Sequence, residues 1–276
     1  MIIPLFLLYI LFAGQKNEVV SSNPIHKNLR YLIDDSLIAL DGQFNITESR
    51  SLATRESVAN SMSFSAAYMD VSTRHTEDLP VIIQVNSTTI PNSSGFYHTA
   101  FDSAASQSIS GNTILITSAS TDTNSYAHFH KRFYVPKAIH MSFPDYTAIG
   151  FDLSGNAENA TNINSDDAIT WNSDVSNAFG VIITVEYIPN YLGNDSLQLI
   201  GNSISQRNLI TVPDNGSATL NCELTKDIPD HSIIKLTISR GNAVVFPAPK
   251  NSSKKLKITA STTEDGLFRF NKHKKN

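Results

Sequence analysis

Cysteine is almost absent from this chain, in which Cys222 is the only one among 276 residues. A single thiol excludes an internal disulfide, so the fold must be held together by its hydrophobic core. Around this cysteine, Ala218, Leu220 and Leu224 alternate with polar residues. The period of two predicts a strand with the thiol on its buried face; an intermolecular disulfide and a reactive nucleophile are the alternatives.

Charge and catalytic signatures are scarce as well. Charged residues make up 17% of the chain and the net charge is −4, which argues against nucleic acid as a partner. The sequence has no G-x-S-x-G elbow, no H-E-x-x-H pair and no glycine-rich phosphate loop. We therefore expect a protein that is not an enzyme.

Only one long apolar run is present, from Ile2 to Ala13. A run of about a dozen apolar residues matches the core of a secretory signal peptide, whereas a membrane-spanning helix needs roughly 17–25. We therefore expect a signal peptide at 1–14, no transmembrane segment, and a secreted, extracellular protein. No Lys or Arg precedes the run, and a buried strand and an uncleaved anchor are the alternatives.

Asparagine, serine and threonine are abundant, and they form seven Asn-x-Ser/Thr sequons. In an exported protein, sequons accept N-linked glycans and mark surface positions. We expect glycosylation at Asn45, Asn86, Asn92, Asn159, Asn194, Asn215 and Asn251.

From about residue 60, short β-rich runs alternate with turn-forming residues. Met62, Phe64, Ala66 and Tyr68 alternate with mostly small polar residues, which is typical of a half-buried strand. Many short strands with almost no helical periodicity indicate an all-β fold of the sandwich or barrel kind.

The number of runs predicts the domain organisation. About fifteen strands exceed one ordinary sandwich, so we expect two antiparallel β-sandwich domains, at 56–189 and 190–276. An N-terminal segment, 15–55, precedes them. Within it, residues 29–40 have helical spacing and form either a short helix or a strand.

Acidic side chains gather in the loops of the first expected domain. Asp152, Asp167 and Asp174 lie near several asparagines, and calcium is bound by loops that supply carboxylate, amide and carbonyl oxygens. These three residues are candidate calcium ligands, and the sequence suggests no cofactor other than calcium. Ordinary turns, in which Asp and Asn side chains bind their own backbone, are the alternative.

Two other clusters carry potential chemistry. His128 and His130 lie two residues apart and would share a face of a strand, as two ligands of a transition metal do; solvated histidines are the alternative. The basic end from Arg269 to Lys275 would suit acidic glycans or lipid headgroups, or form a solvated tail.

Two stretches resemble CUB-type sandwiches, in particular the CUB-like domains of secreted nematode proteins. From Trp171 to Gly180, a Ser-Asp pair precedes a short loop and then an aromatic-rich strand, and Cys222 leads to Ile228-Pro229 and an apolar strand. The resemblance implies CUB-like, non-catalytic binding modules, deployed at epithelial surfaces in defence (an innate immune response) or stress. The chain departs from the family in lacking the partner cysteine, and only Asp174 matches the family's acidic calcium ligands.

These observations favour a secreted, glycosylated, non-catalytic protein that binds an extracellular protein or carbohydrate through its loops. A metal-dependent extracellular enzyme using His128 and His130 is one alternative. A structural coat or matrix protein linked through Cys222 is the other.

Overall fold

The computed structural model describes residues 40–51, 61–70, 75–77, 79, 81–120, 126–143, 161–187, 206–249 and 251–272. Most of them form β-strands, and α2 (Ser103–Ile109) is the single helix among them. The chain is therefore all-β, as predicted. No helix in these ranges has the length and hydropathy needed to cross a membrane. The predicted signal peptide and the 29–39 part of the predicted helix or strand lie outside the described residues.

The strands belong to three sheets, which we call sheets A, B and C. Sheet A contains β1 (Gly42–Ser51), β2 (Ser61–Asp70), β3 (His75–Glu77), β6 (Asn92–Ser93), β7 (Phe96–Phe101), β11 (Asn162–Asn164), β13 (Val181–Tyr187), β14 (Gln206–Val212), β16 (Ser232–Ala248) and β17 (Asn251–Asn271). Sheet B contains β4 (Val81–Val85), β5 (Thr88–Ile90), β8 (Thr113–Ser120) and β9 (Phe129–Tyr134). Sheet C contains β10 (Met141–Phe143), β12 (Ala168–Trp171) and β15 (Ser217–Thr219).

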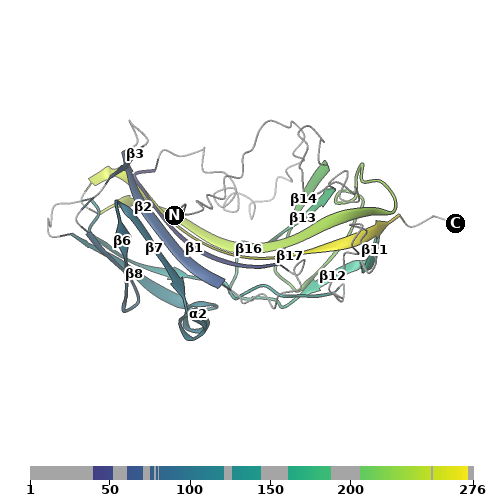
Figure 1. Ribbon diagram of the computed structural model, residues 1–276, viewed down its shortest axis with the longest axis horizontal. Helices are drawn as coiled ribbons and strands as arrows, with labels where there is room; N and C mark the ends of the chain where they lie inside the picture. The colour runs from purple at the N-terminus through teal and green to yellow at the C-terminus, as the bar shows by residue number, and fades with distance from the viewer. Residues whose placement is uncertain are drawn as a thin grey trace, which may run out of the picture.

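The hairpin of β16 and β17 runs through the length of sheet A. The two strands pair antiparallel from Ser232 opposite Phe270 to Ala248 opposite Asn251. In Figure 1 this hairpin curves from one end of the described structure to the other, with its middle lower than its ends; β8 and α2 lie below one arm and β12 lies below the other. One continuous sheet thus supports both ends of the structure.

Two pairings of β17 correct the expectation of antiparallel sheets. β1 runs parallel to β17, with Gly42 opposite Leu256, and β11 runs parallel to the end of the same strand. Strands so far apart in the sequence are not joined by a tight hairpin, so nothing in the turns dictates an antiparallel direction. β1 also places the end of segment 15–55 in sheet A. Its apolar residues Phe44 and Ile46 alternate with polar residues, which is the pattern of a strand with one buried face.

The first hydrophobic core lies between sheet A and sheet B. Side chains of β1, β2, β7 and the turn end of the β16–β17 hairpin pack against β4, β8 and β9. Phe44 is at its centre, with its ring edge to face with Tyr68 and Phe129 at 5.5 and 5.1 Å between centroids.

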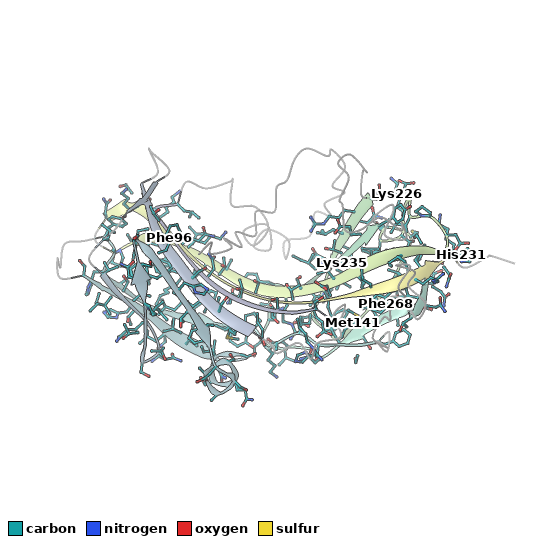
Figure 2. The ribbon with its side chains drawn as sticks, in the orientation of Figure 1. Phe96, Met141, Lys226, His231, Lys235 and Phe268 are labelled. Carbon is teal, nitrogen blue, oxygen red and sulfur yellow. The ribbon has the colours of Figure 1, made fainter. Side chains whose placement is uncertain are left out.

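The second core lies at the other end of the hairpin. It contains side chains of β12, β13, β16 and β17 together with apolar residues of the turn after β15. Met141 and Phe268, labelled in Figure 2, mark this arm of the molecule. The β17 residues that enter the two cores are all even-numbered, from Leu256 to Phe270. Even-numbered residues of one strand share a face, so both cores lie on the same side of sheet A.

The predicted domain boundary near residue 190 falls inside one sheet. β13 precedes it and β16 follows it, yet they pair from Val181 opposite Arg240 to Tyr187 opposite Ile234. The two cores separate instead within the long strands, where core-facing positions change from apolar to polar, as at Ile238 and Arg240. Because the two cores separate within continuous strands, no linker segment in the sequence marks the place.

Candidate functional site

A row of polar side chains crosses the core-facing side of sheet A between the two cores. We call it the polar belt, and it consists of Glu48, Arg50, Arg240, Thr262 and Glu264. Glu48 lies opposite Thr262, which on its other side lies opposite Arg240. Arg50 lies opposite Glu264. Sequence reasoning missed this belt, although each member occupies an inward position of an alternating strand.

Arg240 is fully buried and bridges the belt to the loops around sheet C. Its Nη2 donates to Asp214 Oδ1 at 2.9 Å and to the carbonyl of Asn172, and its Nη1 donates to the carbonyl of Lys137 at 3.2 Å. Burial lowers the pKa of Arg240, while the neighbouring carboxylate of Asp214 opposes that shift. The buried charge is therefore matched inside the protein.

Asp214 is the acceptor at the centre of this network. Besides Arg240, Trp171 Nε1 donates to Oδ1 at 2.9 Å and Asn177 Nδ2 donates to Oδ2 at 2.8 Å. Asn177 Nδ2 also donates to the carbonyl of Gly180. The stretch from Trp171 to Gly180 thus contributes two donors to a buried structural network.

Asp174, a candidate calcium ligand, is buried beside this network. Its carboxylate accepts the Tyr134 hydroxyl at 2.8 Å and the backbone N–H groups of Lys137 and Ser176 at 2.9 and 3.1 Å. Burial and the contact with Asp174 raise the pKa of Tyr134 to about 12, so the hydroxyl keeps its proton. Both oxygens of Asp174 therefore already accept protein donors.

The other calcium candidates do not join Asp174. Asp167 Oδ2 accepts the backbone N–H and Nδ2 of Asn164 at 2.7 and 3.1 Å, a turn contact at the opposite end of β12. Asp152 lies outside the described residues. Within the described ranges, no group of three His, Cys, Asp or Glu side chains is arranged to hold a metal ion. Calcium binding stays a prediction.

At the other half of the polar belt, the side chains of Arg50 and His140 are both partly exposed to solvent. Glu264 is 0% exposed; its Oε2 lies 3.2 Å from His140 Nδ1 and 3.5 Å from Arg50 Nη1. Glu264 Oε1 accepts the N–H of Met141 at 3.0 Å. Glu48 is 8% exposed, and its Oε2 is buried without a hydrogen-bond partner. Burial raises the pKa of Glu48, and the nearby His140 opposes the shift.

The paired histidines lie together as their spacing predicts. The rings of His128 and His130 meet edge to face with 5.5 Å between centroids. Two rings can make this contact without a metal ion. Among the described residues, no third His, Cys, Asp or Glu joins them to complete the metal site that a metal-dependent enzyme would need.

Cys222 is exposed, so the prediction of a buried thiol was wrong. β15 ends at Thr219, and the chain then turns: the N–H of Thr225 donates to the carbonyl of Asn221, whose Oδ1 accepts the N–H of Leu224. Leu220 and Leu224 are therefore buried four residues apart, with the thiol between them facing outward. A turn with near-helical spacing has replaced the expected alternation.

The predicted glycan acceptors differ in their surroundings. Four are exposed on turns or strand ends: Asn86, Asn92, Asn215 and Asn251. Asn45 instead lies half-buried in the middle of β1, where its Oδ1 accepts Thr259 Oγ1 at 2.6 Å and Gln43 Nε2 at 3.2 Å. Asn159 and Asn194 lie outside the described residues.

The outer face of sheet B combines apolar and basic side chains. We call it the sheet B face, formed by Ile82, Gln84, Leu115, Thr117, His130 and Arg132. Ile82 and Leu115 are 57% and 37% exposed, and Leu115 lies opposite the exposed Arg132. The neighbouring pair, Thr117 and His130, extends the face along the same strands. The four strands of sheet B contain no Asp or Glu.

No protein-family model matches this chain, and no curated protein is significantly similar to it in sequence.

Proposed function

We propose that this chain is a secreted, glycosylated binding protein of CUB-like β-sandwich type, without catalytic activity of its own. The apolar run at Ile2–Ala13 supports export, and the exposed sequon asparagines outside sheet B, Asn92, Asn215 and Asn251, support glycosylation. Asn86 lies beside Leu115 of sheet B and its Oδ1 accepts the Leu115 N–H, so a form without a glycan at Asn86 is the one proposed to bind. The absence of catalytic motifs from the sequence supports a binding role. The polar side chains around Arg240 and Asp214 are engaged with each other, which suits a scaffold.

The sheet B face is the proposed binding surface, and its combination of exposed apolar side chains with an arginine is the main support for a binding role. Exposed apolar side chains beside arginine are typical of protein interfaces, where Arg and apolar anchors are buried together. Arg132 is the basic side chain of this face, and the strands beneath it contain no carboxylate; Lys131 lies on the other side of the sheet, over the Phe246 ring. The partner is therefore an extracellular protein with acidic side chains around an apolar patch.

A protein suits this face better than an acidic polysaccharide does. Burying the exposed side chains of Ile82 and Leu115 lowers the free energy of the complex, and only an apolar surface on the partner can bury them. A sulfated or carboxylated glycan would satisfy Arg132 and His130 and leave both apolar side chains in water.

Binding of a model acidic polypeptide tests this proposal. A copolymer of L-glutamate and L-tyrosine, which offers acidic and aromatic side chains together, should bind the full-length secreted protein in low salt more tightly than poly-L-glutamate does, and Arg132→Glu should weaken this binding by about tenfold or more. Lys226→Glu makes the same charge change on the other arm of the molecule (Figure 2) and should leave binding unchanged. Equal loss in both variants, or binding of heparin as tight as that of the glutamate–tyrosine copolymer, would refute an acidic protein partner.

Export and glycosylation are tested separately. Expressed in a secretory cell line, the full chain should appear in the medium and lose mass on treatment with an N-glycosidase. Retention inside the cell without glycans would contradict this part of the proposal.

A further inference from the structure

The loop between β14 and β15 contains a chemically labile side chain, the amide of Asn215. Gly216 follows it, and this is the only Asn-Gly pair in the chain. Asparagine is a thermolabile residue, and it is most labile before glycine, because a residue without Cβ leaves its backbone nitrogen unhindered. Asn215 is exposed, so water reaches it.

The loop folds the side chain of Asn215 forward along the chain. Its Oδ1 accepts the N–H of Ser217 at 3.3 Å, and its own N–H donates to the carbonyl of Pro213 at 2.9 Å. The contact with Ser217 closes a turn-like ring that includes Cγ of Asn215 and the nitrogen of Gly216. The two atoms that would form a bond are therefore members of one small ring in the folded protein.

The fold requires glycine at position 216. Its φ is +90°, a conformation that other residues rarely adopt, and a Cβ there would lie 3.0 Å from the carbonyl oxygen of Trp171. The carbonyl of Gly216 accepts the N–H of Trp171 at 2.9 Å, next to the pairing of β15 with β12. The structure of sheet C therefore keeps the reactive pair in place.

We propose that Asn215 is a site of spontaneous covalent modification, at which deamidation loosens the buried network around Asp214. The nitrogen of Gly216 attacks Cγ of Asn215 and gives up its proton. The side-chain amide nitrogen takes up that proton and leaves as ammonia, so a succinimide ring remains. Water then opens the ring. Opening at Cγ yields aspartate, and opening at the main-chain carbonyl yields isoaspartate, whose backbone runs through Cβ.

Isoaspartate lengthens the main chain between two fixed points. On one side, the Asp214 carboxylate is held by Arg240 Nη2, Trp171 Nε1 and Asn177 Nδ2. On the other side, the Gly216 carbonyl is bonded to the backbone of Trp171. The additional methylene must move Asp214 away from its donors or β15 away from β12. Aspartate keeps the length of the chain and adds only a charge at an exposed position.

A glycan on Asn215 would prevent this reaction. N-glycosylation substitutes Nδ2, the nitrogen that must leave as ammonia. The reaction therefore belongs to chains without a glycan at Asn215, and it does not depend on the proposed binding role.

Peptide mapping by mass spectrometry tests the site on the full chain, produced in a bacterial host that adds no N-glycans and incubated folded in mildly alkaline buffer. The control is Asn251 of the same molecule, which is exposed and whose Oδ1 accepts the N–H of Ser253 in the same way, but which precedes a serine. Asn215 should convert to aspartate and isoaspartate at least about tenfold faster than Asn251. Asn215→Gln, whose longer side chain does not form the succinimide, should show no conversion at this position.

Urea unfolding followed by Trp171 fluorescence tests the consequence. The isoaspartate form, separated by chromatography after incubation, should have a lower urea midpoint than the unmodified protein. Freshly prepared Asn215→Asp should have a midpoint close to that of the unmodified protein, because its backbone is unchanged.

Three results would overturn the proposal. They are equal rates of conversion at Asn215 and Asn251, conversion of Asn215 only in the urea-unfolded protein, and an isoaspartate form with the urea midpoint of the unmodified protein. Because the comparison of rates uses the wild-type chain, it remains decisive even if a variant folds poorly.

Discussion

Removal of the Asp214 carboxylate should cost the protein a large part of its stability. Three buried donors lose their acceptor in Asp214→Ala: Arg240 Nη2, Trp171 Nε1 and Asn177 Nδ2. Breaking a buried ion pair leaves an unmatched charge and costs about 3–5 kcal/mol. Asp214→Asn keeps an oxygen acceptor of the same shape, so we expect a smaller loss.

Urea unfolding followed by tryptophan fluorescence measures this loss. Trp171 is the only tryptophan, and it lies in the second core in direct contact with Asp214. The matched control is Lys235→Gln, which breaks the half-exposed pair Lys235–Asp265 on the other side of sheet A and should cost less than about 1 kcal/mol. If Asp214→Ala loses no more unfolding free energy than Lys235→Gln does, the buried network around Asp214 does not stabilise the fold.

Three further predictions concern single residues. Glu48→Gln should raise the free energy of unfolding by about 1–2 kcal/mol at neutral pH, and urea titrations should show the gain shrinking toward about pH 4, because only the ionised carboxyl is destabilising there. Cys222 should react with one equivalent of a maleimide without denaturant; a thiol that labels only after unfolding would contradict its exposed position. Asn45→Ala should lose about 1 kcal/mol of unfolding free energy through its contacts with Thr259 and Gln43, and an unchanged urea midpoint would contradict this.

The parts of the fold that local patterns encode were predictable. Alternation at Met62, Phe64, Ala66 and Tyr68 identifies β2 and the face that it buries. The all-β class follows from many such runs. α2 was missed, although Asp102 before a run of small residues is a helix-capping signal, and its Oδ1 accepts the N–H of Ala105.

Contacts between distant strands were not predictable in the same way. The belt forms because β1 pairs with β17, which brings Glu48 opposite Thr262 and Arg50 opposite Glu264 from the two ends of the chain. No local pattern specifies that register. The sequence does contain one usable signal, a charged residue at an inward position of an alternating strand, as at Arg240.

Cys222 shows the converse limit. Its alternation with Leu220 and Leu224 has the period of a strand, but residues four apart also share a side of a helical turn. Hydrogen bonds to Asn221 select the turn, so the same two leucines are buried and the thiol is exposed.

The central claim, that the sheet B face binds an acidic protein, is tested most directly by hydrogen exchange of the full chain with and without the glutamate–tyrosine copolymer. We predict added protection confined to peptides that contain β4, β8 and β9, and its loss in Arg132→Glu. Added protection confined to β14, β16 and β17, or none at a concentration that saturates binding, would contradict it.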